Sequence, residues 1–287
     1  MPNKLNSKLK NYLKRFLAAG RIYKFFWMHP KGMQKKLHKN SVIHVRTNPE
    51  ATSEVELDLI FNKPRDVKST EIVKQKIQEL NSTYNLLFFD LGAHIGWYTL
   101  LASEHLPPEK IFAVEADPTN FALLNEQLRL NGIEGSNTFN CAIIPHPDTL
   151  TFGIHKKRSN KNRINPPLER RNEFNFITID GDSFDNLSSE YYKVSGACYF
   201  VRMDIEGAEE NFPGSASQLL QSAAPCVIFA ELHPWINKRI FARNLEENGF
   251  KLTWARKDKG ATQSVKDDFD ALLDAPGSLH VRFERFS

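Results

Sequence analysis

The fold is decided by one run of residues, Phe88-Phe89-Asp90-Leu91-Gly92-Ala93-His94-Ile95-Gly96-Trp97-Tyr98-Thr99. Leu86 to Phe89 is a short apolar run, which is typical of a parallel strand covered on both faces. Gly92 and Gly96 lack a Cβ, so the backbone after the strand can turn sharply and approach a ligand closely. A helix predicted from Trp97 to His105 would point its free N–H groups at that ligand.

The spacing of these glycines disfavours a nicotinamide dinucleotide as the ligand. A dinucleotide fingerprint needs G-x-G-x-x-G after the strand, whereas His94 occupies the middle position here. The carboxylate of Asp90 beside the turn also suits an ammonium or sulfonium group better than a phosphate. The turn therefore indicates a positively charged ligand.

Acidic residues follow several predicted strands. The strand from Lys110 ends at Glu115, the position from which doubly wound sheets bind the two ribose hydroxyls. Asp117-Pro118 then opens a helix, with Asp as N-cap and Pro at the first helical position. Because the carboxyl ends of parallel strands meet at one edge, we expect one site to gather five ionisable groups: Asp90, Glu115, Asp204, Glu231 and His233.

Other segments receive shorter predictions. A third strand is expected at Asn137 to Ile144, and residues 41 to 84 should contain a strand and a helix from Ile72 to Leu80. Val55, Leu57 and Leu59 alternate as in a strand. Strands at 149–155 and 174–179 should flank a polar loop that is rich in Lys and Arg and contains the acid Glu169. Such a loop either binds an anionic acceptor or is simply solvated.

One motif in that loop resembles a nucleic-acid signature. Asn165-Pro166-Pro167 occurs with an aromatic residue in amino-methylating DNA enzymes, but Leu168 stands in the aromatic position here. A base methyltransferase also needs rings that stack on a flipped base. We therefore interpret the prolines as loop stiffeners and do not expect nucleic acid as a partner.

Four motifs together resemble the FkbM family of S-adenosylmethionine-dependent methyltransferases. They are Asp90-x-Gly92-Ala93-His94-x-Gly96-x-Tyr98-Thr99, Val114-Glu115-Ala116-Asp117-Pro118-x-x-Phe121, Asp204-Ile205-Glu206-Gly207-Ala208-Glu209 and Glu231-Leu232-His233-Pro234. The similarity extends from about Asn85 to Trp254. It implies a Rossmann-like class I methyltransferase fold, α/β, with a mostly parallel central sheet flanked by helices. An N-terminal helical extension would precede it.

The resemblance also implies roles for individual residues. Asp90, Gly92 and Gly96 would frame the methionine part of the cofactor. His94 stands where class I methyltransferases generally have a glycine and where the FkbM family usually has Asn or His. Glu115 would bind the ribose. Two further residues, Asn140 and Ala142, would border the adenine. Asp204 would lie beside both the methyl group and the acceptor. The family mostly methylates oxygen on sugars, polyketides and other small or lipid-linked molecules.

Methyl transfer to a hydroxyl needs help in removing the proton, since a sugar hydroxyl is a weak acid. His233 is the candidate base, because imidazole titrates near neutral pH. Alternatively, Asp204, Glu231 and His233 would bind Mg²⁺ or a similar ion. A third interpretation, that His233 has only a structural role, is as probable as the base and metal-ligand roles together. Glu206 either orients the acceptor or, like Glu209, only favours the start of a helix.

Composition and charge predict the cellular compartment and one possible surface contact. Three cysteines, no apolar run of about 18 residues and no secretory signal predict a cytoplasmic protein. Residues 1–40 hold eleven of the 38 Lys and Arg residues and no acid, which leaves 27 basic and 34 acidic residues in the rest. The net +4 thus belongs to an N-terminal arm. Leu5, Leu9, Tyr12 and Phe16 recur there at helical spacing. Such an arm binds an anionic membrane surface, packs on the body or, less favoured, contacts nucleic acid.

We therefore expect an arm (1–40), a lead-in segment (41–84) and an S-adenosylmethionine-binding domain (85–287). The predicted activity is O-methylation of a hydroxyl on a sugar, glycolipid or other small molecule. Two alternatives remain open. One is a nicotinamide-dependent sugar oxidoreductase, and the other is a catalytically silent adaptor that does not bind S-adenosylmethionine.

Overall fold

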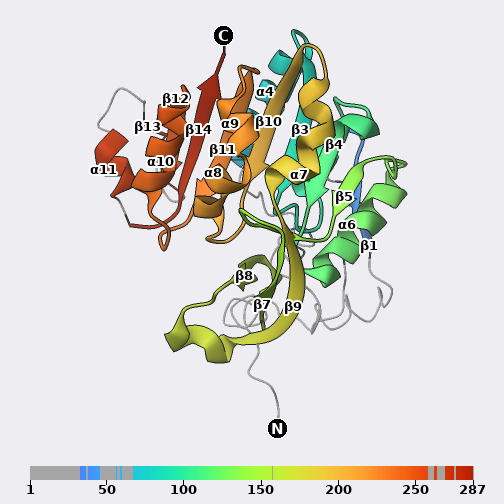
Figure 1. Cartoon of the computed structure of the whole chain (residues 1–287). Coiled ribbons are helices and arrows are strands. Elements are labelled where there is room, and N and C mark those ends of the chain that lie inside the picture. The colour runs from blue at the N-terminus through green and yellow to red at the C-terminus, as the bar shows by residue number, and fades with distance from the viewer. Residues whose placement is uncertain are drawn as a thin grey trace.

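A computed structural model describes residues 33–36, 38–45, 56, 59, 67–156, 158–257, 262–263, 269–274 and 276–286. Most of these residues form one α/β body, from which a small second sheet projects (Figure 1). The apolar N-terminal pattern at Leu5 to Phe16 lies outside the described residues, so the predicted membrane arm stays a prediction. None of the described helices has the length and hydropathy that a membrane span requires.

The main sheet has the order β13-β12-β14-β11-β10-β3-β4-β5. Its parallel part consists of β3 (Asn85–Leu91), β4 (Ile111–Val114), β5 (Asn137–Phe139), β10 (Ala197–Met203) and β11 (Cys226–Leu232). Its antiparallel edge consists of β12 (Lys251–Lys257), β13 (Thr262–Gln263) and β14 (Leu279–Arg285). The predicted mostly parallel sheet flanked by helices is confirmed.

Helices cover both faces of this sheet, which explains why its central strands are almost wholly apolar. Phe88 and Phe200 point to one face, on which lie α4 (Val67–Asn81), α5 (Trp97–Ser103) and α6 (Pro118–Leu130). Phe89 and Tyr199 point to the other, which is covered by α7 (Phe184–Ser188), α8 (Phe212–Ser215), α9 (Ser217–Gln221) and α10 (Lys238–Glu247). A short α11 (Phe269–Leu273) precedes β14.

The small sheet has the order β6-β9-β7-β8. It consists of β6 (Ala142–Ile143), β7 (Asp148–His155), β8 (Arg163–Ile164) and β9 (Phe174–Asp182). In Figure 1 it extends from the edge of the main sheet at which the parallel strands end. The strands predicted at 149–155 and 174–179 are confirmed, and they pair antiparallel as β7 and β9.

The described N-terminal residues form a hairpin of β1 (Met33–Lys36) and β2 (Val42–Val45). This hairpin crosses the boundary placed at residue 40. It is attached to α6, because the Val42 N–H donates to the Asn131 side chain at 2.8 Å and the His44 N–H to the Gln127 side chain at 2.7 Å.

Two sequence-based predictions need correction. The strand expected at Asn137 to Ile144 is broken, because the chain leaves the main sheet after Phe139 and enters the small sheet at Ala142. Leu59 is helical and not part of a strand, while Val55 and Leu57 lie outside the described residues. Leu59 is buried, so its apolar character is explained without a strand.

Candidate active site

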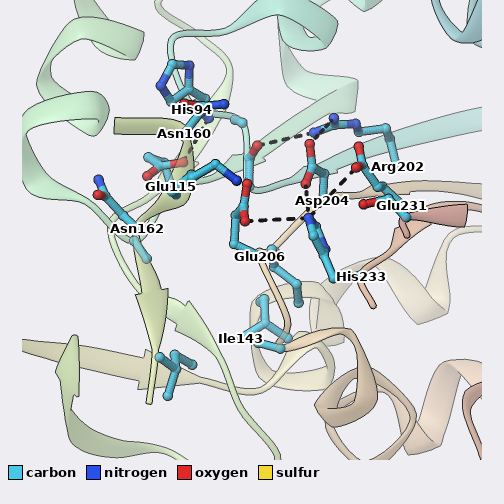
Figure 2. Close-up of a pocket in the computed structure, with 18 of the residues that line it drawn as sticks. His94, Glu115, Ile143, Asn160, Asn162, Arg202, Asp204, Glu206, Glu231 and His233 are labelled. Atoms are coloured by element: carbon cyan, nitrogen blue, oxygen red, sulfur yellow. Dashed lines mark hydrogen bonds and ion pairs between the residues drawn. The ribbon is translucent and has the colours of Figure 1, made fainter. Parts of the chain in front are cut away.

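A cavity of about 1050 Å³ lies where the parallel strands of the main sheet end. Figure 2 shows two groups of polar side chains in it, with His94, Glu115 and Asn160 on one side and Asp204, Glu231 and His233 on the other. Four of the five strand-end residues line it: Glu115, Asp204, Glu231 and His233. Ligands of open α/β sheets bind at this edge, so the cavity is the candidate active site.

The turn after β3 brings the backbone close to the cavity. Gly92 has a φ of 77°, and a Cβ there would overlap the carbonyl oxygen of Asp204. His94 has a φ of 53°, a conformation that is unusual for a residue with a side chain. This geometry explains why a glycine is the usual choice at the position of His94. Such strained residues cluster at functional sites.

Glu115 is held in place by the same turn. One carboxylate oxygen accepts the His94 N–H at 2.8 Å and the other accepts the Asp117 N–H at 2.9 Å. Burial raises the pKa of Glu115 to about 7, although the two N–H donors oppose the rise. Since a carboxylate has about four acceptor positions, lone pairs remain for a ligand that donates hydrogen bonds.

Asp90 does not line the cavity. Its side chain is fully buried, accepts a hydrogen bond from Thr99 Oγ1 at 2.7 Å and lies 3.4 Å from Arg202 Nη1. Burial raises the pKa of Asp90, against the opposing charge of Arg202. The expectation that Asp90 lines the site with the other strand-end groups is therefore wrong, because its carboxylate pairs with Thr99 of α5 and with Arg202 beneath the turn.

Arg202 is a site residue that the sequence analysis missed. Its Nη2 donates to Asp204 Oδ2 at 2.9 Å, its Nη1 donates to the Gly92 carbonyl at 3.2 Å, and its guanidinium lies 4.4 Å from the ring of Tyr98. A single cation inside the otherwise apolar strand β10 was the available signal. Arg202 connects the first turn of the site to the acidic group described next.

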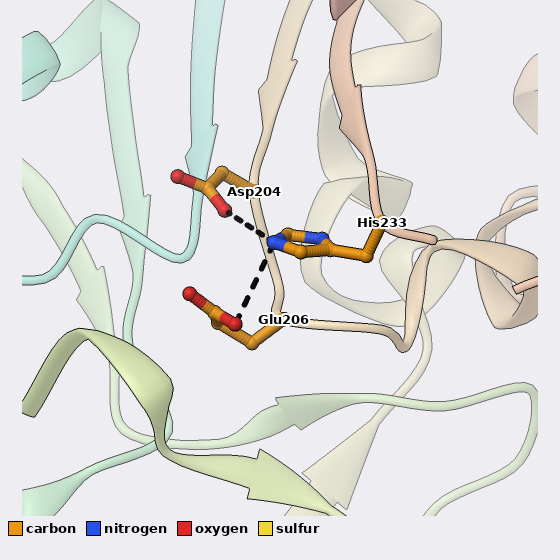
Figure 3. A group of neighbouring side chains, drawn as sticks. All are labelled: Asp204, Glu206 and His233. Carbon is orange, nitrogen blue, oxygen red and sulfur yellow. Dashed lines mark ion pairs between the residues drawn. The ribbon is translucent and has the colours of Figure 1, made fainter. Parts of the chain in front are cut away.

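Asp204, Glu206 and His233 form the second group of the cavity (Figure 3). His233 Nδ1 is hydrogen-bonded to Glu209 Oε1 at 2.8 Å, so Nε2 faces the carboxylates. Nε2 lies 3.5 Å from Glu206 Oε2 and 3.9 Å from Asp204 Oδ1. Glu231 flanks the group, with Oε1 at 3.8 Å from the same nitrogen. The four candidate catalytic residues are thus neighbours.

Charge dominates the electrostatics of this group. Burial alone would lower the pKa of His233, but Glu209, Glu206 and Asp204 raise it to about 10. Burial raises the pKa of Glu206 to about 8, with the Asp204 carboxylate adding to the effect. Arg202 holds the pKa of Asp204 below its usual value against burial. An imidazole with so high a pKa is protonated at pH 7, which disfavours His233 as a resting base.

Two other residues with predicted cofactor contacts lie outside the cavity. Gly96 starts α5 with a φ of 94° and its missing Cβ gives room to Leu124. Asn140 is exposed and its amide donates to the carbonyl oxygens of Glu115 and Ala116 at 2.8 and 3.3 Å. Ala142, by contrast, lines the cavity, as do Gly92, His94 and Glu206.

The remaining wall comes from segments without a clear sequence signal. The predicted polar loop contributes Ser159 and Lys161, and Ser159 Oγ lies 3.0 Å from His94 Nε2. Trp235 stacks on His233 at 5.0 Å between ring centroids. Gly207, with a φ of 99°, makes room for this indole, because a Cβ there would overlap its nitrogen.

Comparison with known proteins identifies the chain at the level of family. Residues 90–252 match the methyltransferase FkbM domain. No curated protein sequence matches the chain significantly. Two similar solved structures are a precorrin-6y C5,15-methyltransferase from Geobacter metallireducens (12% identity, 77% of this chain and 87% of that one, TM-score 0.42) and M. jannaschii TYW2 in complex with AdoMet (15%, 89% and 87%, 0.43). The assignment rests on the family match and not on these structures.

The site and the sheet around it define a class I methyltransferase. The chain belongs to the FkbM methyltransferase family, because the matched domain covers more than half of it. It is an S-adenosylmethionine-dependent methyltransferase. The cavity fits that cofactor, since Glu115 offers fixed acceptors on one side and an excess of carboxylates faces the other, where a sulfonium would be stabilised.

Proposed function

We propose that the protein transfers a methyl group from S-adenosylmethionine to a hydroxyl oxygen of a sugar, glycolipid or other small molecule. The observation that carries this proposal is the group of Asp204, Glu206 and His233 in the cavity, across from Glu115. Two partly buried carboxylates and a buried imidazole, with ligand atoms within 4.8 Å of one another, are groups that can act on a hydroxyl proton.

The cofactor supplies an activated methyl group, so the protein has to align the acceptor and remove its proton. Glu115 fixes one end of the cavity through two backbone N–H groups. Asp204, held by Arg202, keeps a negative charge next to the reacting centre. Glu206 and His233 bind or orient the acceptor oxygen from the opposite side of that centre.

Further polar residues of the cavity support a polar acceptor. Lys257, Ser278 and His280 also line the cavity, as does the half-exposed indole of Trp235. Polar groups of this kind orient a ligand that has several hydroxyls. Lys161 adds a cation from the basic segment, which favours an acceptor with an anionic group, free or lipid-linked. Peripheral attachment to an anionic membrane through the basic arm belongs to the same proposal.

The acceptor class is tested with S-adenosylmethionine labelled in the methyl group. The full chain is incubated with sugars, glycolipids, amines, RNA and protein in parallel. We expect label in a sugar or lipid fraction, in a product that survives mild alkali as a methyl ether does. Label only in RNA, protein or amines would contradict O-methylation of small molecules.

Binding separates methyl transfer from the two alternatives. Titration calorimetry should show binding of S-adenosylmethionine and S-adenosylhomocysteine and none of NAD. Binding of NAD alone would favour an oxidoreductase, and binding of none of the three would favour an adaptor.

A further inference from the structure

We propose that Asp204, Glu206 and His233 bind one divalent cation, Mg²⁺ or Mn²⁺, on which the acceptor hydroxyl is deprotonated. The inference rests on the proposed O-methylation, because it explains how that site lowers the pKa of the hydroxyl. It differs from the set Asp204, Glu231 and His233 expected from the sequence, since Glu206 is the second carboxylate of the cluster.

The distances fit shared coordination better than direct contact. The carboxylate oxygens of Glu206 and Asp204 lie 3.5 and 3.9 Å from His233 Nε2. Both distances exceed a normal hydrogen bond of about 2.7–3.2 Å. Two ligands on one octahedral cation at about 2.1 Å lie roughly 3 Å apart when adjacent and about 4 Å when opposite. The two carboxylate oxygens therefore lie about as far from Nε2 as two ligands of one small cation lie from each other.

The histidine is oriented for metal binding, in which the cation would replace the proton on Nε2. His233 is 4% exposed, and within the described part of the chain its Nε2 makes no hydrogen bond. Its Nδ1 pairs with the buried Glu209 at 2.8 Å, and Glu209 also accepts the N–H groups of Ile205 and Gly207. A metal-binding histidine is commonly oriented by such a carboxylate on its other nitrogen.

The environment of the Asp204 carboxylate also favours a cation at this place. Its Oδ2 is satisfied by Arg202, but its Oδ1 is buried without a hydrogen-bond partner among the described residues. A buried acceptor without a partner is costly. Because Oδ1 is the oxygen that faces His233 Nε2, a cation between the two would satisfy both atoms.

Two carboxylates and one imidazole leave coordination positions for water and for the acceptor. Oxygen-rich sets of this kind suit Mg²⁺ or Mn²⁺. A hydroxyl bound to such an ion loses its proton to solvent water. Its oxygen then attacks the methyl carbon, the carbon–sulfur bond breaks, and the bonding pair goes to sulfur. The products are the methyl ether and neutral S-adenosylhomocysteine.

The test measures binding of MnCl2 to the full chain by electron paramagnetic resonance, with S-adenosylhomocysteine present. We expect one Mn²⁺ per chain, with a dissociation constant between about 10⁻⁵ and 10⁻³ M. Glu206→Gln should weaken this binding at least about tenfold. The matched control is Glu210→Gln, because Glu210 is exposed and outside the cluster. The control should stay within about twofold of the wild type.

A second readout separates the cation from the sulfonium. If the carboxylates interact only with the sulfonium, Glu206→Gln should weaken the binding of S-adenosylmethionine but not that of S-adenosylhomocysteine. The wild type should then bind no stoichiometric Mn²⁺. This result would overturn the proposal. Asp204→Asn replaces Glu206→Gln if the latter does not bind S-adenosylhomocysteine. If the chain binds no Mn²⁺ but still transfers a methyl group to a hydroxyl, the metal site is contradicted and the proposed O-methylation is not. If the chain binds Mn²⁺ but methylates no hydroxyl, the metal site is supported and the proposed O-methylation is contradicted.

Discussion

The two sides of the cavity are built in different ways. On the cofactor side, Glu115 is fixed by the backbone N–H groups of His94 and Asp117 before any ligand arrives. On the reactive side, Asp204 and Glu206 face one imidazole nitrogen at distances too long for hydrogen bonds. The first side is therefore preorganised, whereas the second contains a carboxyl group, that of Glu206, whose pKa burial raises to about 8.

This difference indicates what each side binds. A carboxylate whose position is set by the backbone suits a neutral polar group such as a pair of ribose hydroxyls. Arg202 and His233 offset only part of the acidity of the reactive side, because burial still raises the pKa of Glu206 to about 8. A further positive charge, from a sulfonium, a metal ion or both, would therefore favour the ionised form of Glu206.

The largest expected effect comes from His233→Ala. Turnover should fall on the order of 10²- to 10⁴-fold, because the imidazole that forms the reactive group with Asp204 and Glu206 is removed. Affinity for S-adenosylhomocysteine should stay within about twofold, which also shows that the variant folds. His146→Ala, at an exposed histidine, serves as the control. Equal loss of turnover and affinity would mean that the two sides do not act separately.

The next effect is a pH dependence of stability from Glu115. The pKa of Glu115 is about 7 when folded, against 4.5 as the ordinary value, so the folded state keeps a proton that the unfolded state has released. The free energy of unfolding should therefore fall as pH rises from 4.5 to 7, by about 3 kcal/mol from this group. Urea unfolding at both ends of this range should show a much smaller fall for Glu115→Gln. An equal fall of the free energy of unfolding in the wild type and in Glu115→Gln would contradict the raised pKa of Glu115 in the folded state.

A smaller effect is expected on cofactor affinity. Glu115→Ala should weaken S-adenosylhomocysteine by roughly 2 kcal/mol, or about 30-fold, since hydrogen bonds to a charged acceptor are lost. Asn140→Ala should change it less than about threefold, because that exposed amide lies outside the cavity. Calorimetry compares the two. A larger loss of affinity for Asn140→Ala than for Glu115→Ala would contradict the position of the ribose beside Glu115.

The smallest effect concerns the support of the reactive side. Gly207→Ala and Gly132→Ala both place a side chain at positive φ, 99° and 68°, and should each cost about 1 kcal/mol in strain. Only at Gly207 would the new methyl overlap Trp235, whereas nothing lies near Gly132. Gly207→Ala should therefore also lower turnover. Equal turnover in both variants would show that the packing of Trp235 on His233 is dispensable.

The sequence predicted the strands and the acids at their ends because each of these is a local pattern. An apolar run followed by Glu115 or Asp204 can be recognised from a few residues. Asp90 follows the same pattern, but its burial depends on Arg202, which lies 112 positions away in the chain. Such a long-range pair leaves no periodic signal.

The small sheet marks the limit of the sequence analysis for the same reason. Its two central strands, β7 and β9, were predicted, but the break after Phe139 was not, since the residues on both sides favour strand. Ser159 reaches His94 only because β7 and β8 fold back over the turn. The polar loop thus gave no indication which of its residues would line the cavity.

The most direct test of the account is a crystal structure of the full chain with S-adenosylhomocysteine. We predict both ribose hydroxyls within about 3.2 Å of the Glu115 carboxylate, with the sulfur directed at Asp204 and Glu206. A nucleoside bound away from Glu115, or a sulfur that faces away from Asp204 and Glu206, would contradict it.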